Sequence, residues 1–146
     1  MSEQLTKLAK PFHPRYVDKK GKFDYVSHSE VSQNLLGIVG PHNIEVKHII
    51  YVDGKVDGVI VALTCIIDGR EVTVEEAGGI GTRSMSDSGE LLKEGISDAL
   101  KRCAMRLGLG LHLWAQDNYY LHDALLKKEE SNGYRHRLLK KEESNG

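Results

Sequence analysis

The stretch from residue 44 to residue 77 constrains the fold more than any other part of the sequence. Ile44–Val52, Val56–Ile67 and Arg70–Ala77 are rich in Val, Ile and Thr, residues that favour extended structure. Asp53-Gly54 lies in the turn between the first two runs. Asp68-Gly69 closes a tight hairpin between the last two, because Asp-Gly supplies the positive φ angles of a type I′ turn. The segment therefore predicts a three-stranded antiparallel meander.

Two features of this meander bear on its surroundings. Val59–Ile67 is almost wholly apolar, which predicts a strand that is covered on both faces or one that lies at a subunit interface. The glycine-rich segment that follows, Gly78-Gly79-Ile80-Gly81, lacks both the GxxxxGK[ST] and the GxGxxG pattern. We therefore interpret it as the end of the sheet and not as a phosphate-binding loop.

One helix is predicted before the meander in the chain and another after it. Ser27 and Glu30 have the spacing of a capping box, and apolar residues at i, i+4 and i+7 follow, so residues 28–39 are expected to be helical. Asp87–Leu107 is longer and carries one apolar stripe at helical spacing. With a short strand at Lys22–Val26, the element order becomes β-α-β-β-β-α. We expect an α+β fold in which the antiparallel sheet packs on one long helix.

The two ends of the chain are less regular in sequence. Residues 1–22 are polar and basic, and two prolines and a glycine prevent one continuous helix there. The nonapeptide LLKKEESNG occurs at 125–133 and again at 138–146, which is too short a repeat for a solenoid unit. We expect one domain over residues 1–120 and a mobile low-complexity tail over residues 121–146.

Composition excludes several classes of protein. No apolar stretch approaches the roughly 18 residues of a membrane span, and the first residues lack the apolar segment of a secretory signal. The two cysteines lie far apart and outside any CxxC spacing, so we expect reduced thiols, a cytoplasmic location and no membrane contact. The histidines have no metal-site spacing, and neither a nucleophile motif nor a paired carboxylate cluster is present. We expect no metal, no cofactor and no enzymatic activity.

The charge distribution leaves room for a basic surface. The formal net charge of −1 argues, taken alone, against a nucleic-acid-binding protein. The charges are segregated, however, because the segment from Lys7 to Tyr25 contains mostly basic residues, whereas the acidic residues gather elsewhere. A local basic face is therefore compatible with the overall charge.

The polar face of the long helix is the first candidate for binding chemistry. It carries Lys101, Arg102 and Arg106, with Lys93 two turns before Lys101. Arg102 and Arg106 lie one turn apart and would present guanidinium groups to successive phosphates. The alternative is an ordinary ion-paired surface, because Asp98 and Arg102 have the i, i+4 spacing of a helical salt bridge.

Arg15 and Tyr25 form the second candidate. A cation for phosphate and an aromatic ring for stacking are the usual components of a site for single-stranded nucleic acid. The alternative is a loop arginine and a tyrosine of the core. Aromatic residues make up only 6% of the chain, so phosphate contacts would have to dominate and make the affinity sensitive to salt.

Several segments resemble the annealing domain of the Rad52-type single-strand annealing proteins. The most specific is Lys93–Arg102 followed by Leu107–Gly110, which is similar to the family's "KEAxxDALKRAxxxFG" signature. The other segments are Tyr25-Val26 running into Leu36–Pro41, the meander with its Asp68-Gly69 turn, and Glu76–Gly81. Their order agrees with the family throughout, and together they cover about residues 11–120.

The resemblance implies a β-β-β-α core that assembles into a ring by joining sheets edge to edge, with single-stranded DNA in a basic groove around it. Lys101 and Arg102 match the family's groove-lining pair, and Arg15 and Tyr25 match an arginine and a tyrosine of the same groove. The family has a further arginine on this helix, and it lies one residue nearer to the Lys-Arg pair than Arg106 does here. A further residue, Arg83, stands in a shortened loop where the family has a second basic site.

We therefore expect a compact protein of the phage or bacterial type. It would bind single-stranded DNA as a ring-shaped homo-oligomer and anneal complementary strands without ATP during homologous recombination and DNA repair. A single-strand-binding protein or an exonuclease is a further partner that the resemblance leaves open. The alternative function is that of an oligomeric α+β protein-interaction module without DNA binding.

Overall fold

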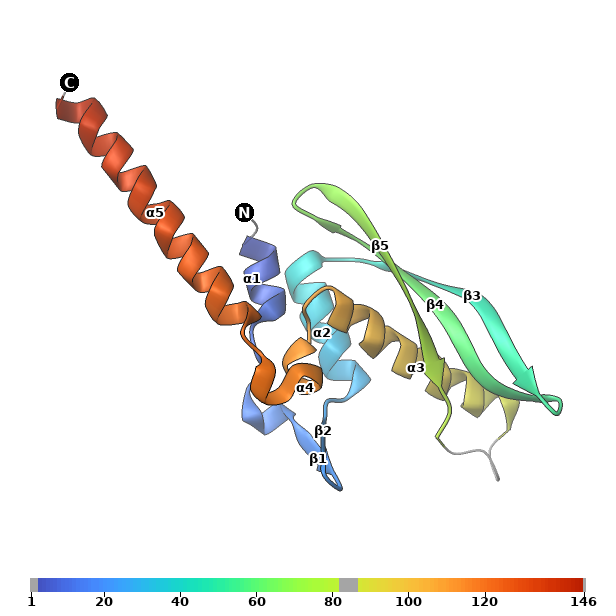
Figure 1. Ribbon diagram of the computed structural model, residues 1–146. Helices are drawn as coiled ribbons and strands as arrows, with labels where there is room; N and C mark the ends of the chain where they lie inside the picture. Colours follow the sequence, from blue (N-terminus) through green and yellow to red (C-terminus); the bar gives the residue numbers. More distant parts are fainter. Residues whose placement is uncertain (1–2, 82–86, 146) are drawn as a thin grey trace.

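A three-stranded antiparallel sheet forms the centre of the computed structural model, which describes residues 3–81 and 87–145. Its strands β3 (Asn43–Val52), β4 (Lys55–Ile67) and β5 (Arg70–Gly79) follow one another in space as they do in the chain (Figure 1). Asp and Gly have positive φ angles in both turns, 51° and 77° in the first and 55° and 73° in the second. The predicted meander and its Asp-Gly hairpin are confirmed.

Helix α3 (Ser88–Arg106) covers one face of this sheet. Alternate residues of β4, from Val59 to Cys65, are buried there against Ala99, Leu100 and Cys103 of the helix. Ile66 points to the opposite face and is 56% exposed. Ala62 on that opposite face is only 4% exposed, so the single chain covers both faces of β4 in its middle but not near its end. The subunit interface remains a prediction.

Both predicted helices begin at the expected capping residues. α2 (His28–Val39) is capped by the Ser27 hydroxyl, which accepts a hydrogen bond from the Glu30 N–H at 3.3 Å. α3 is capped by the Asp87 carboxylate, which accepts from the Glu90 N–H at 2.8 Å. The mixed α+β architecture is therefore confirmed.

The N-terminal region contains more structure than the sequence indicated. α1 (Glu3–Ala9) ends before the first proline and buries Leu8 completely in the main core. A short 3₁₀ turn, η1 (Pro14–Tyr16), leads into a separate two-stranded hairpin of β1 (Asp18–Lys20) and β2 (Phe23–Tyr25). The predicted strand at Lys22–Val26 is confirmed as β2, with β1 as its unexpected partner.

The C-terminal region, where the sequence indicates a mobile low-complexity tail, is helical, and its mobility stays a prediction. After α4 (Leu111–Ala115) and η2 (Gln116–Asn118), one helix, α5 (Leu121–Asn145), contains nearly all of both nonapeptides. The reason is that Leu, Lys and Glu are strong helix formers. The start of α5 packs on α1, where the Thr6 hydroxyl donates to the Glu129 carboxylate at 2.5 Å, and the remainder projects away from the body (Figure 1). No helix in the part of the chain described here has the length and apolarity of a membrane span.

Candidate nucleic-acid interface

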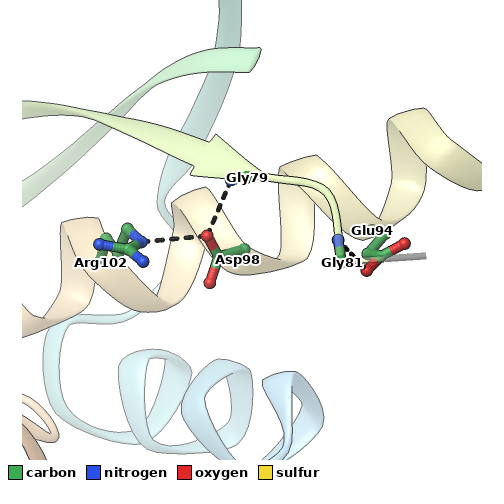
Figure 2. A network of polar contacts seen from close by, with 5 residues as sticks. All are labelled: Gly79, Gly81, Glu94, Asp98 and Arg102. Carbon is green, nitrogen blue, oxygen red and sulfur yellow. Dashed lines mark hydrogen bonds and ion pairs between the residues drawn. The ribbon is translucent and has the colours of Figure 1, made fainter. Parts of the chain in front are cut away.

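The end of β5 is fixed to α3 by two carboxylates of the helix (Figure 2). The Gly79 N–H donates a hydrogen bond to Asp98 Oδ2 at 2.9 Å, and the Gly81 N–H donates to Glu94 Oε1 at 2.8 Å. Glu94 and Asp98 lie one helical turn apart, so they meet the N–H groups of two alternate residues as the strand leaves the sheet. We call this contact between the glycine-rich strand end and α3 the helix–strand junction.

Gly78 explains why the helix–strand junction requires glycine. A Cβ atom at this position would lie 1.9 Å from the Gly95 carbonyl oxygen and 2.7 Å from the Ala99 nitrogen. Both are backbone atoms of α3, so only a residue without a side chain allows the helix to approach this closely. The glycine-rich segment therefore serves close packing, which agrees with its interpretation as the end of the sheet.

Arg102 extends from the same helix one turn beyond Asp98. Its Nε–H donates to Asp98 Oδ2 at 3.0 Å, so the i, i+4 ion pair considered from the sequence is present. Its guanidinium carbon lies 4.8 Å from the centre of the Trp114 ring of α4. The carboxylate contact uses the Nε–H of a group that carries five donors, and the side chain is 39% exposed.

The neighbouring residue, Lys101, reaches the N-terminal hairpin. Its ammonium group donates to the Val26 carbonyl at 3.4 Å and lies 4.8 Å from the centre of the Tyr25 ring. The structure thus brings together two predicted site residues, Lys101 and Tyr25, that are far apart in the sequence. Each cation of the Lys101-Arg102 pair lies against an aromatic ring from a different element.

A cavity of about 340 Å³ opens between these elements. We call it the aromatic cavity, because β2, α3 and α4 enclose it with rings from two sides. Its lining includes Phe23, Asp24, Tyr25, Asp98, Lys101, Leu113, Trp114 and Gln116. Apolar walls with a few convergent polar groups are the usual composition of a ligand site.

Arg15 and Lys93 lie outside the lining of this cavity. The Arg15 guanidinium lies 4.5 Å from the centre of the Tyr16 ring and also donates to the Tyr16 hydroxyl. It stands three residues before Asp18, which pairs with Tyr25 across the β1–β2 hairpin. Lys93 is exposed on α3, two turns before Lys101. The last of the predicted residues, Arg83, falls outside the residues that the structure describes.

Arg106 is directed toward the sheet. Its Nε–H donates to the Glu76 carboxylate of β5, and this bond lowers the pKa of Glu76 below its ordinary value. Arg106 therefore has an internal partner, unlike the arrangement expected for two guanidinium groups that contact successive phosphates. Its part in DNA binding stays a prediction.

Sequence reasoning missed three residues that define the aromatic cavity. Phe23 could have been found, because it lies two residues before Tyr25 on the same strand and therefore on the same face. Trp114 and Gln116 gave no comparable signal, since a chain reversal at Gly108 and Gly110 brings them back beside α3. Within residues 3–81 and 87–145, no three His, Cys, Asp or Glu side chains gather as a metal site requires.

The comparison with known families identifies the family of the chain. The chain matches the sequence profile described as the Rad52/22 family double-strand break repair protein over residues 1–132. A search of the curated proteins gives no match. The family profile extends over most of the chain and includes the helix–strand junction and the Lys101-Arg102 pair. The chain therefore belongs to the Rad52/22 family of double-strand break repair proteins.

Proposed function

We propose that this protein binds single-stranded DNA and promotes the annealing of complementary strands without ATP during homologous recombination and repair. One observation carries the proposal. Lys101 and Arg102 are adjacent on a rigid helix, and each lies against an aromatic ring beside the same cavity. A single-strand site needs fixed cations for phosphates and aromatic surfaces for bases. Lys101 and Arg102 supply the cations, and the rings of Tyr25 and Trp114 supply the surfaces.

The binding step is electrostatic. Lys101 and Arg102 attract phosphates and release the counterions that surround them, with Arg15 of the N-terminal segment as an additional cation. The strand is held by its backbone, so its bases can pair with a second strand. Base pairing itself supplies the free energy of annealing, and no nucleotide hydrolysis is required.

Assembly into a ring would multiply these contacts. In the described residues, β3 and β5 are the edge strands of the central sheet, and each has one side without a strand partner. Edge strands of this kind pair readily with another chain. A closed ring that joins β3 of one protomer to β5 of the next would line up the Lys101-Arg102 pairs, and weak contacts in each subunit would add up through effective concentration.

The proposed site is tested with two double variants, each of which replaces two adjacent cations by alanine. Lys101→Ala/Arg102→Ala should lower the affinity for single strands, reduce the salt slope by about 0.7 for each lost phosphate contact, and slow ATP-free annealing. Lys127→Ala/Lys128→Ala removes the same charge from exposed positions of α5 and should anneal as the wild type does. Sedimentation and circular dichroism check assembly and folding. If Lys101→Ala/Arg102→Ala assembles normally and anneals as fast as the wild type, the proposed site is wrong.

A protein-interaction module without DNA binding is the competing function. The net charge of −1 and the internal ion pairs of Arg102 and Arg106 are the observations that favour it. Such a module would assemble but would have no salt-dependent affinity for single strands. The salt titration of the wild type therefore separates the two functions.

A further inference from the structure

We propose that the aromatic cavity takes one nucleobase of the bound strand in each protomer, stacked on Trp114. This inference rests on the proposed function, because it names how the same surface holds its ligand. It goes beyond phosphate binding, because it says that a nucleobase enters the aromatic cavity and names the residues that contact it.

Exposed aromatic side chains are the first argument. Phe23 is 71% exposed, Trp114 49% and Tyr25 39%, although all three line the same cavity. Large apolar groups that stay accessible in one hollow indicate an occupant that covers them. Flat rings on the walls favour a flat occupant, because offset stacking is the preferred contact between aromatic systems.

Size is the second argument. About 340 Å³ lies at the lower end of the range for small-molecule sites, so the cavity suits one planar ring system better than a protein segment. Asp24 and Gln116, whose side chains carry a carboxylate and a carboxamide, are among the lining residues. These groups match the donors and acceptors that an unpaired base displays along its edge.

Charge gives the third argument. The two cations beside the cavity, Lys101 and Arg102, would bind the phosphates on either side of the inserted base. Arg102 lies over the Trp114 ring, which nevertheless keeps about half of its surface accessible, so a base can stack there while the guanidinium contacts the adjoining phosphate. A nucleotide combines a negative group with a planar ring in this way. The cavity therefore fits a nucleotide of the bound strand.

The inserted base has a consequence for annealing. A base that stacks on Trp114 is withheld from Watson–Crick pairing, whereas its neighbours remain accessible. The strand would then be presented to its complement in short groups of bases, with one interruption for each protomer.

The experiment uses the fluorescence of Trp114, the single tryptophan of the chain. The full chain is titrated with an oligonucleotide and with an abasic strand of the same length and phosphate count, while an end-attached dye reports binding by anisotropy. The ordinary strand should quench Trp114. The abasic strand should bind about tenfold more weakly and leave the emission nearly unchanged.

Three variants accompany this titration. Trp114→Leu should lower affinity for the ordinary strand by about tenfold and leave affinity for the abasic strand within about twofold. Phe23→Ala keeps the reporter, changes an exposed position and should reduce the quenching. Tyr134→Leu alters an exposed aromatic residue of α5 outside the cavity and should behave as the wild type.

The outcomes distinguish the base site from the proposed function. Equal quenching by both strands, or an equal loss of affinity for both strands in Trp114→Leu, overturns the base site while phosphate binding stands. Absence of binding by either strand at low salt overturns the proposed function as well. A change in emission with protein concentration alone, and none on adding DNA, would show that a second copy of the chain covers the cavity, which also overturns the inference.

Discussion

Replacing Gly78 by alanine should separate helix α3 from the sheet. The added Cβ would lie 1.9 Å from the Gly95 carbonyl oxygen, whereas the closest ordinary contacts between carbon and oxygen are about 3.3 Å. The obstructing atoms belong to the helix backbone, so no side-chain rotation can relieve the clash, and α3 has to move outward by roughly 1 Å or more. Overpacking of a core costs about 1–3 kcal/mol and occasionally more.

The hydrogen bonds of the helix–strand junction would weaken together with this contact. The N–H groups of Gly79 and Gly81 depend on the carboxylates of α3, and each such bond contributes about 1 kcal/mol. We therefore expect Gly78→Ala to lower the free energy of unfolding by about 3–5 kcal/mol. Urea unfolding followed by circular dichroism measures this loss, at one protein concentration because assembly also affects stability.

Gly79→Ala is the matched control for this substitution. No atom lies within 4 Å of the position of its added Cβ, and its N–H group is retained. Alanine also restricts the unfolded chain more than glycine does, so the variant should equal the wild type or gain up to about 1 kcal/mol. Equal unfolding midpoints for the two variants would refute the argument from close packing.

Two further predictions concern titratable groups. Burial lowers the pKa of His112, and its Nδ1 atom has no hydrogen-bond partner within the described residues. Stability should therefore be complete above about pH 6.5, where the unfolded histidine is neutral, and decline as the pH falls below it. His112→Phe keeps an aromatic ring beside Phe12 and should flatten this decline in unfolding measurements between about pH 5 and 7; an unchanged profile would contradict the assignment. Arg106→Gln should cost less than about 1 kcal/mol at neutral pH, because the Arg106 side chain is 58% exposed. The ion pair lowers the pKa of Glu76, so its contribution is present at neutral pH and is lost as the pH falls through that lowered pKa, and the difference from the wild type should vanish in acid. A fall of about 0.7 in the salt slope of DNA binding would instead identify Arg106 as a phosphate contact.

The parts of the fold that were predictable are those that short-range chemistry determines. Ser27 and Asp87 cap the helices that follow them, and Asp-Gly turns set the hairpins, so each of these elements was visible in a few consecutive residues. α1 could not be found in this way, because a seven-residue helix is marginal in isolation and is held here by the burial of Leu8. α5 was missed because its repeat indicated low complexity, although its residues favour helix.

The candidate site was likewise predictable only where neighbouring residues in the sequence determine it. Lys101 and Arg102 were visible as adjacent cations on one helix, and Tyr25 as an aromatic residue near a basic segment. That Lys101 lies on Tyr25, while Arg102 lies on Trp114, follows from how the hairpin and α4 pack against α3. Long-range packing of this kind has no local pattern in the sequence. The same holds for Arg106, whose partner Glu76 comes from the opposing sheet.

The geometry of α5 limits what this helix can pack against. Leu125-Leu126 and Leu138-Leu139 are equivalent pairs of the two nonapeptides, and 13 residues separate them. At 3.6 residues per turn and 1.5 Å per residue, the second pair lies about 20 Å farther along the axis and roughly 140° around it. Leu125 is buried, whereas Leu138 and Leu139 are 43% and 59% exposed. Leu126 is also 39% exposed, so the body of the protein receives only one leucine of the first pair. Leu139, fourteen residues after Leu125, returns to within about 40° of it around the axis but lies about 21 Å farther along. The length of the helix therefore carries Leu139 past the surface that buries Leu125.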